Sequence, residues 1–219
     1  MRTTLILAAM LAAAAPVAAQ SGSKADPDVK VQGAPLPSGW HMRLDRANAD
    51  ASAVKFVTMG SGYHATLGPS GIFWNPSSTA SGAYTASATF RQTKAAAHPE
   101  AYGLLIGGQK LDQPDQDYLY YVIRQDGKYL IKHRAGTEVH TLVEWTEHPA
   151  IRKMDAQGQA TNALSVQVGP DQVRFLANGQ EVKVLERGGL NTNGIVGLRV
   201  NHNLDVHIDG PTVVAATSK

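Results

Sequence analysis

Polar and apolar side chains alternate along most of the chain beyond residue 50, and a period of two is typical of β-strands with one buried face. The clearest case is the segment 84–91, YTASATFR, in which tyrosine, alanine and phenylalanine alternate with hydroxyl or charged side chains. The same alternation returns after residue 162 in ALSVQVG, QVRFLANG and QEVKVL. Glycine, proline and asparagine separate these runs, so we predict about a dozen short strands and no helix.

Two dipeptides predict tight turns between strands. Asp-Gly interrupts the segment 117–134, DYLYYVIRQDGKYLIKHR, and Asn-Gly stands at 178–179. Both favour a two-residue type I′ turn, because both central residues of that turn need a positive φ. The next apolar segment, TEVHTLVEW at 137–145, would extend the first hairpin into a three-stranded meander.

The loop length decides which side chains share a face of the first hairpin. A two-residue loop pairs Tyr120 with His133, so Tyr120, Arg124 and His133 would lie on one face. Both faces of this hairpin are half apolar, as expected inside a layered structure. We therefore predict an all-β fold, a sandwich or jelly roll of two antiparallel sheets formed by residues 40–219 as one domain.

The first residues have a different composition. MRTTLILAAMLAAAAPVAA, residues 1–19, has one positive charge, an apolar run and a small-residue cleavage site, which predicts a secretory signal peptide. Residues 20–39 are rich in Ser, Pro, Gly and charge, which is typical of a flexible arm. We therefore expect an exported bacterial protein, periplasmic or extracellular; the absence of cysteine excludes disulfides and thiolate–zinc sites but not export.

Charge excludes one class of partner. The formal net charge is +2 and no Lys/Arg run stands out, so we do not expect nucleic acid as a partner. No second apolar run reaches the roughly 18 residues of a membrane-spanning helix. The sequence leaves the oligomeric state open.

Several segments together have a familiar order: AYGLLIGG (101–108), YLYYVIRQDGKYLIKHR (118–134), the segment around Trp145, NALSVQVGPDQVRFLANGQEV (162–182), and GIVGLRV followed by LDVHIDG (194–210). They resemble secreted bacterial concanavalin A-like jelly rolls, which include laminin-G-like modules and the domain family named for 3-keto-disaccharide hydrolases. The resemblance covers residues 50–213 and implies two large antiparallel sheets, one bent into a concave face that often binds carbohydrate. The chain lacks the Glu-x-Asp-x-x-Glu run of laminarinase-type enzymes and the Asn-Ser-Gly-rich strand of keto-disaccharide hydrolases, so the resemblance does not imply catalysis.

Two groups of side chains are candidates for binding a ligand. Tyr120, Arg124 and His133 combine an aromatic ring with cations, as a sugar-stacking surface does. The alternative is ordinary packing of tyrosines on a half-buried strand. The second group, near the C-terminus, has the planar amides and guanidinium that form forked hydrogen bonds with sugar hydroxyls: Arg199, Asn201, Asn203 and His207. Asparagines also favour turns, so residues 201–203 could instead close a hairpin.

Catalytic and metal sites have weaker signals. Asp205, His207 and Glu144 are the candidates for acid–base chemistry, and the alternative for Asp205 and His207 is a solvated outer face. No metal site or other cofactor is expected. A calcium site in the loop DQPDQD is kept as an alternative, and turn formation explains that loop equally well: Asp112, Asp115 and Asp117.

The sequence as a whole favours an exported module that binds a carbohydrate or an envelope polymer on a concave face. Two alternatives stay open: a glycoside hydrolase-like enzyme that acts on a saccharide, and a structural or protein-interaction module of the cell envelope. The sequence leans against an enzyme but does not decide the question, because one jelly-roll fold serves all three functions.

Overall fold

The computed structural model describes residues 26–216, and these form fourteen strands in two antiparallel sheets of seven. In spatial order, sheet A contains β1 (His41–Leu44), β4 (Gly71–Ala80), β13 (Gly194–Val200), β6 (Ala101–Gln109), β7 (Asp117–Arg124), β8 (Lys128–Ala135) and β9 (Glu138–Glu147). Sheet B contains β12 (Gln180–Glu186), β11 (Gln172–Ala177), β10 (Ala160–Val168), β5 (Tyr84–Gln92), β14 (Asp205–Ala215), β3 (Gly62–Leu67) and β2 (Val54–Met59). The predicted all-β sandwich of about a dozen strands is confirmed.

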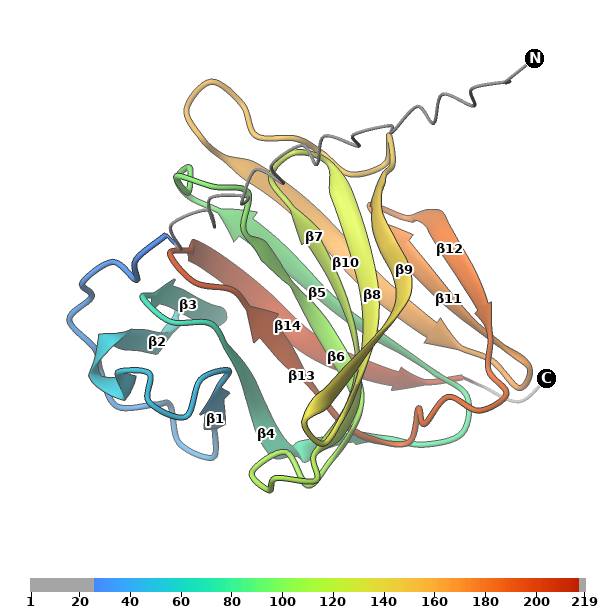
Figure 1. Cartoon of the computed structure of the whole chain (residues 1–219). Helices are drawn as coiled ribbons and strands as arrows, with labels where there is room; N and C mark the ends of the chain where they lie inside the picture. The colour runs from blue at the N-terminus through green and yellow to red at the C-terminus, as the bar shows by residue number, and fades with distance from the viewer. Residues whose placement is uncertain (1–25, 217–219) are drawn as a thin grey trace, which may run out of the picture.

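Alternation along the strands decides which side chains fill the space between the sheets. On β5, Tyr84 and Phe90 point inward and are buried, whereas Arg91 on the other face is exposed. Sheet A contributes inward side chains such as Phe73 and Leu104 to the same core. Figure 1 shows the sheets as two layers, with β7 and β8 in one layer and β5 and β14 in the other. Each large apolar side chain buried here stabilises the fold by about 1.5–3 kcal/mol.

Two of the predicted connections are confirmed. Ala177 pairs with Gln180, so the loop between β11 and β12 has two residues, as predicted from Asn-Gly at 178–179. Strands β7, β8 and β9 are neighbours in sheet A, which is the predicted meander.

The predicted register of the β7–β8 hairpin is wrong by one residue. Tyr120 lies opposite Lys132, not His133. The loop has three residues, 125–127, and its glycine has φ 84° and donates its amide to the carbonyl of Arg124 at 3.0 Å. A three-residue loop that ends in a left-handed glycine is the next most common hairpin connection. Because side chains alternate, the one-residue shift exchanges the two faces of β8 relative to β7.

Residues 201–203 connect the two sheets. They join β13 of sheet A to β14 of sheet B, so the alternative in which they close a hairpin is wrong. Asn203 has φ 57°, and its backbone amide donates to the carbonyl of Gly68 at 3.1 Å. Asparagine tolerates this left-handed conformation better than other side chains, which suits it to a sharp change of direction.

Residues 26–39 contain no helix or strand and lie against the domain. The amide of Gly33 donates to the carbonyl of Ser52 at 2.8 Å, and the amide of Val29 donates to Oδ1 of Asn203 at 2.7 Å. These bonds tie the segment to both the start and the end of the folded chain.

Two predictions for the N-terminus concern residues outside the range 26–216. The predicted signal peptide at residues 1–19 lies outside the described residues, and so do residues 20–25 of the predicted arm. Between residues 26 and 216, no helix is long and apolar enough to cross a membrane. The helical structure in that range is one 3₁₀ turn, Ala51–Ala53.

Sheet A is less regular than sheet B. Its register shifts at four strand pairs, whereas that of sheet B shifts at two, and such bulges bend and twist strands. Glycines stand where neighbouring strands come closest. A Cβ on Gly103 would lie 2.1 Å from the carbonyl oxygen of Tyr121, and one on Gly197 would lie 2.6 Å from that of Phe73. The centre of sheet A therefore has two positions at which no side chain fits.

Candidate functional site

Sheet A has a second apolar cluster on its outer face, which points away from sheet B. A sheet in a sandwich commonly has one solvated face, so large apolar side chains on the outer side need an explanation. The cluster contains Ile72, Trp74, Ala101, Leu105, Leu111, Tyr118, Tyr120, Val122 and Leu130, with Trp145 and Ile195 packed against it. Aromatic rings on this face make it the first candidate for a ligand site.

Arg199 crosses this apolar cluster from β13. Its guanidinium carbon lies 5.0 Å from the centre of the Tyr120 ring. Its Nη1 and Nη2 donate to the two carboxylate oxygens of Asp45 at 2.9 and 2.6 Å. The sequence predicted Tyr120 and Arg199 as binding residues, and the structure brings these two into contact. Asp45 was missed, because it lies 154 positions from Arg199 in the chain.

Burial and charge together set the protonation states of this group. Burial alone would raise the pKa of Asp45, but the charge and hydrogen bonds of Arg199 outweigh it and hold that pKa below its ordinary value. Burial would lower the pKa of Arg199, and the carboxylate of Asp45 raises it instead. Burial raises the pKa of Tyr120. At neutral pH the group is therefore an ion pair beside a neutral phenol.

A second arginine–aromatic contact lies at the end of β7. Nε and Nη2 of Arg124 donate to the two carboxylate oxygens of Asp126, each at 2.8 Å. The guanidinium carbon of Arg124 lies 4.4 Å from the centre of the Trp145 ring. Contacts of this kind fix the plane of the guanidinium. The predicted binding residue Arg124 therefore shares the outer face of sheet A with Tyr120.

Two further arginines lie at the other end of this face. Arg43 and Arg134 line one small cavity together with Asp45 and Tyr118. Nη1 of Arg134 donates to the carbonyl of Thr137 at 3.2 Å, and its Nε is buried without a hydrogen-bond partner among the described residues. The alternation of HMRLD at 41–45 places Arg43 of β1 and Asp45, which follows the end of β1, on the same side of the chain. No sequence pattern predicted that this side of the chain would meet β8.

The side chains around these two tyrosines form one group, the aromatic–arginine cluster: Arg43, Asp45, Tyr118, Tyr120, Arg134 and Arg199.

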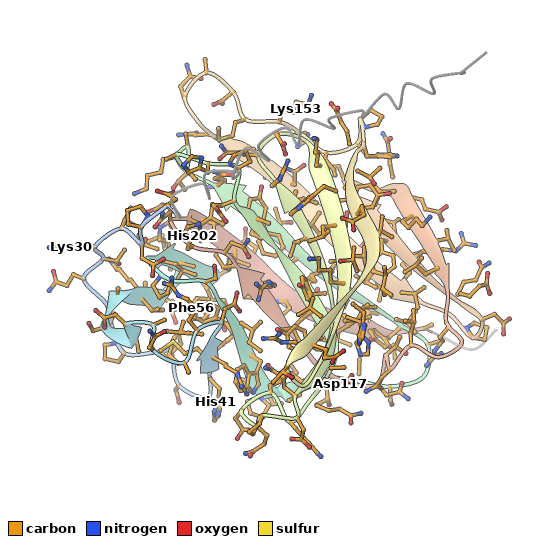
Figure 2. The ribbon with its side chains drawn as sticks, in the orientation of Figure 1. Lys30, His41, Phe56, Asp117, Lys153 and His202 are labelled. Atoms are coloured by element: carbon orange, nitrogen blue, oxygen red, sulfur yellow. The ribbon has the colours of Figure 1, made fainter. Side chains whose placement is uncertain are left out.

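His133 does not join the aromatic–arginine cluster, so the prediction that it shares a face with Tyr120 and Arg124 is wrong. The shifted hairpin register turns it to the opposite face. Its Nε2 lies 3.1 Å from Oδ2 of Asp117, and its ring centre lies 6.0 Å from that of His140. Figure 2 shows Asp117 and Lys153 at opposite ends of the sandwich, and His133 lies at the Asp117 end.

The predicted binding residues Asn201 and Asn203 contact other parts of the protein. Nδ2 of Asn201 donates to Oε2 of Glu100 at 3.2 Å. Nδ2 of Asn203 donates to Oδ2 of Asp26 at 3.1 Å, while its Oδ1 accepts from the N-terminal segment. Between them, His202 lies 2.7 Å from Glu100, on the side of the molecule where Figure 2 shows Lys30. This stretch fastens the N-terminal segment to the domain.

The three candidate catalytic residues lie in two different sheets. Asp205 and His207 alternate with buried residues of β14, so they lie on the outer face of sheet B. Glu144 lies on β9, at the edge of sheet A, and is exposed. Nε2 of His207 lies 3.4 Å from Oδ1 of Asp209. The structure therefore does not bring Glu144 together with Asp205.

Asp205 is held by several donors. Thr66 donates to it at 3.0 Å, Thr93 also donates to it, and Nε2 of His64 and Nζ of Lys94 each lie 3.1 Å from it. Burial alone would raise the pKa of Asp205, but the bonds from Thr93 and Lys94 outweigh it and lower that pKa. A carboxylate that stays ionised is unsuited to donating a proton near neutral pH.

The predicted alternative of a calcium loop receives no support from the described residues. Asp115 pairs with Lys110, and Asp117 pairs with His133. Across residues 26–216, no group of three or more His, Cys, Asp or Glu side chains is arranged to hold a metal ion.

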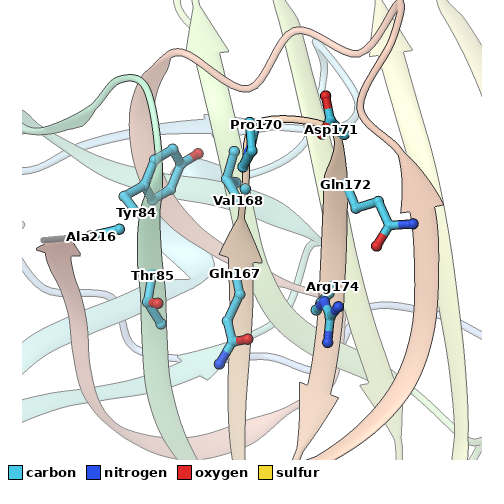
Figure 3. Close-up of a pocket in the computed structure, with 10 residues that line it drawn as sticks. Tyr84, Thr85, Gln167, Val168, Pro170, Asp171, Gln172, Arg174 and Ala216 are labelled. Carbon is cyan, nitrogen blue, oxygen red and sulfur yellow. The ribbon is translucent and has the colours of Figure 1, made fainter. Parts of the chain in front are cut away.

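Sheet B has a hollow of about 580 Å³ on its outer side, and Figure 3 shows its lining. Thr85, Gln167 and Arg174 come from β5, β10 and β11. The aromatic residue in the lining is Tyr84, whose hydroxyl donates to the carbonyl of Thr192 at 2.6 Å in the interior. Tyr84 is only 2% exposed, so the hollow offers little aromatic surface and is a weaker candidate than the outer face of sheet A for stacking a sugar ring.

No family model matches the chain, and no curated protein matches it. Similar solved structures include the carbohydrate-binding module CBM66 from Bacillus subtilis, with a TM-score of 0.60 and 11% identity over 83% of this chain and 100% of that one. A Bacillus subtilis protein of unknown function with a galectin-like fold has a TM-score of 0.59 and 12% identity, covering 82% of this chain and 90% of its own. A β-glucanase from Bacillus licheniformis has a TM-score of 0.55 and 11% identity over 90% of this chain and 100% of its own.

Identities this low show the fold alone. The chain has the jelly-roll architecture of concanavalin A-like proteins, as predicted. The narrower family resemblances stay predictions, because no sequence match supports one of them over another.

Proposed function

We propose that this protein is an exported bacterial saccharide-binding module that binds its ligand across the outer face of sheet A. The observation that carries the proposal is the pair of arginine–aromatic contacts on that face, Arg199 over Tyr120 and Arg124 over Trp145. The similarity of the fold to a carbohydrate-binding module and to a β-glucanase also supports a saccharide as the ligand. Export rests on the signal peptide predicted at residues 1–19.

The chemistry of this face suits sugars. A pyranose ring has an apolar face that stacks on aromatic rings and hydroxyl groups that accept forked hydrogen bonds from guanidinium. Trp145 and Arg124 are partly exposed, with 20% of the Arg124 side chain accessible. Tyr120 is 8% exposed, so we expect it to hold Arg199 in place. The more exposed side chains around Tyr120 would contact the saccharide directly.

A hydrolytic function has less support. Glycosidases use two carboxyl groups that face one another across the bond that breaks, about 5–10 Å apart. Asp205 lies on the outer face of sheet B and Glu144 on the edge strand of sheet A, so they cannot form such a pair. We therefore propose binding rather than catalysis.

The experiment is a glycan-array screen of the protein without residues 1–19, followed by thermal-shift titration of each hit. Two variants test the face: Arg124→Gln, which removes the guanidinium over Trp145, and Trp145→Ala, which removes the ring. Arg174→Gln is the matched control, because this arginine is exposed on the outer face of sheet B and pairs with Glu181. A ligand at 100 times its Kd stabilises a protein by about 2.7 kcal/mol.

We expect a saccharide that raises the Tm of the parent and of Arg174→Gln, and raises it less or not at all in the Arg124 and Trp145 variants. Binding that Arg174→Gln abolishes would move the site to sheet B and overturn the proposal. The absence of any saccharide ligand would overturn it as well.

A second candidate function, protein interaction in the cell envelope, is favoured by the edge strand β9. Val139 and Leu142 on this strand are 41% and 37% exposed, and the outer edge of β9 is unpaired in sheet A. Exposed edges with apolar side chains pair readily with a strand of another chain. If β9 binds a protein of the cell envelope, Val139→Lys would abolish that binding and would leave saccharide binding unchanged.

A further inference from the structure

A carboxylate holds the arginine that lies over Trp145. Asp126 stands two positions after Arg124, in the loop between β7 and β8, and its two oxygens accept from Nε and Nη2 of that arginine, each at 2.8 Å. On its other side the guanidinium meets the indole, with its carbon 4.4 Å from the ring centre. The carboxylate and the ring together therefore fix the plane and the direction of the guanidinium.

The loop that carries Asp126 is itself held on both sides of that residue. The carbonyl of Gln125 accepts from the amide of Met154 at 3.1 Å, and the carbonyl of Gly127 accepts from the amide of His148 at 3.1 Å. Both neighbours of Asp126 in the chain are thus bonded to the segment that follows β9. The carboxylate therefore needs little ordering before a ligand arrives, and such preorganisation favours binding.

The guanidinium of Arg124 has donors left for a ligand. It has five N–H groups, and Asp126 takes one on Nε and one on Nη2. Within residues 26–216 this side chain makes no other hydrogen bond, so two N–H groups on Nη1 and one on Nη2 are free. Neighbouring N–H groups on Nη1 and Nη2 form a fork that matches a pair of oxygen atoms. The Arg124 side chain is 20% exposed and that of Asp126 is 31% exposed, so a ligand can reach this edge from solvent.

Asp126 supplies acceptors at the same edge. Burial alone would raise the pKa of Asp126, but the hydrogen bonds and charge of Arg124 outweigh it and hold that pKa below its ordinary value. An ionised carboxylate has about four lone-pair sites for hydrogen bonds, and Arg124 occupies two of them. The remaining sites can accept from hydroxyl groups, so the pair offers donors and acceptors side by side.

This mixture of donors and acceptors favours hydroxyl groups over acidic groups. A sugar hydroxyl both accepts from the fork and donates to the carboxylate, whereas an ionised carboxylate or sulfate only accepts. An acidic group on the fork would also lie beside the negative charge of Asp126, and like charges repel. Two lysines near this loop, Lys128 and Lys153, lie beside Glu147, which offsets part of their charge. Trp145 adds an apolar surface on which the ring of the same sugar can lie.

We propose that Arg124 and Asp126 together bind two adjacent hydroxyl groups of a neutral sugar, and that Asp126 both orients the guanidinium and accepts from these hydroxyl groups. This inference rests on the proposed saccharide-binding function, and it adds a residue to that site and names the class of its ligand. Without the carboxylate, the fork would lose its fixed direction and would carry a positive charge that nothing in the hydrogen-bonded pair cancels.

The experiment uses one glycan array that holds neutral oligohexoses and the oligohexuronates of the same linkages. The variants are Asp126→Asn, which keeps the size of the side chain and removes its charge, and Asp126→Glu, which keeps the charge. Glu181→Gln is the matched control, because Glu181 pairs with Arg174 on sheet B, and its loss likewise leaves an arginine without its carboxylate. The Kd of each oligohexose and oligohexuronate that binds is then measured in solution by tryptophan fluorescence, and the Tm of each variant is recorded.

We expect the parent to bind neutral oligohexoses at least about tenfold tighter than the matching oligohexuronates. Asp126→Asn should bind the neutral chains at least about tenfold more weakly than the parent does. It should also lose or reverse the preference for them, because the guanidinium then attracts acidic groups without a neighbouring carboxylate. Asp126→Glu should recover part of the affinity for neutral chains, and Glu181→Gln should keep both the affinity and the preference.

Binding of oligohexuronates as tight as that of neutral chains by the parent would overturn the neutral ligand and leave the proposed saccharide-binding function intact. Parent-like affinity in Asp126→Asn would overturn the role of Asp126. A weaker Asp126→Asn that keeps the parent's ratio of neutral to acidic binding would also overturn it, because a merely structural role weakens both classes alike. If the array finds no saccharide of either class, the proposed function itself fails.

Discussion

Replacing Asp45 with asparagine tests whether the ion pair with Arg199 organises the outer face of sheet A. The carboxylate accepts two hydrogen bonds, at 2.9 and 2.6 Å, from a guanidinium whose side chain is 12% exposed. Asparagine keeps one acceptor oxygen and turns an amide toward the guanidinium. Arg199 would then remain largely buried without a neutralising charge.

The burial of this ion pair sets the loss of unfolding free energy expected for Asp45→Asn. Removing one partner of a buried ion pair costs about 3–5 kcal/mol of unfolding free energy. The Asp45 side chain is 34% exposed, and water screens part of the charge that remains. We therefore expect Asp45→Asn to lose about 2 kcal/mol. Asp115→Asn is the control, because Asp115 is 63% exposed beside Lys110 and exposed ion pairs contribute little to stability.

The pH dependence gives a second test. Burial alone would raise the pKa of Asp45, but Arg199 holds it below its ordinary value in the folded protein, while in the unfolded chain it lies near 3.9. A lowered pKa contributes stability that is fully present above the unfolded value and is lost as the pH falls through the folded value. The difference between parent and Asp45→Asn should therefore shrink below about pH 4.

The assay is urea unfolding followed by tryptophan fluorescence at pH 7 and again near pH 3. Two results would refute the reasoning. One is a loss at pH 7 no greater than that of Asp115→Asn. The other is a loss that stays constant down to pH 2, because the contribution would then not depend on an ionised Asp45.

Three further predictions concern the approach of neighbouring strands, the core, and the attachment of the N-terminal segment. Gly103→Ala should cost about 1–3 kcal/mol, because its Cβ would meet backbone at 2.1 Å, whereas Gly188→Ala, with nothing within 4 Å, should be neutral in the same urea titration. Phe175→Ala, at a fully buried position, should cost about 3–5 kcal/mol, and a loss under 1 kcal/mol would argue against the described core. Asn203→Gly keeps the left-handed backbone but removes the side-chain hydrogen bonds to the N-terminal segment. Trypsin should therefore cut after Lys30 faster than in the parent, while the Tm of the domain changes little. Unchanged cleavage would show that these bonds do not hold the segment.

Some features of the candidate site could be predicted from the sequence because they depend on one strand at a time. Tyr118, Tyr120 and Arg124 share a face whatever strand lies beside them, since side chains alternate along any strand. Asn-Gly at 178–179 fixed a two-residue loop through its own backbone preferences. Local patterns of this kind predicted the strands, the β11–β12 hairpin and one face of β7.

Other features depend on pairing between strands and were missed or predicted wrongly. Asp-Gly at 126–127 is compatible with a two-residue or a three-residue loop, and the one-residue difference moved His133 away from Tyr120. The backbone of 201–203 is compatible with a hairpin turn or a crossing between sheets, and the choice depends on where β14 can bury its inner face.

Alternation along the chain is enough to predict strands that each bury one face, and therefore a two-sheet sandwich. It did not determine that Asp45 would reach Arg199 or that Arg43 would lie near Arg134, because those contacts join strands far apart in the chain. Only the tertiary structure placed these groups together, since packing both sheets against one core sets which strands become neighbours. The charged and aromatic face of sheet A is therefore a product of strand order, which no single segment of the chain encodes.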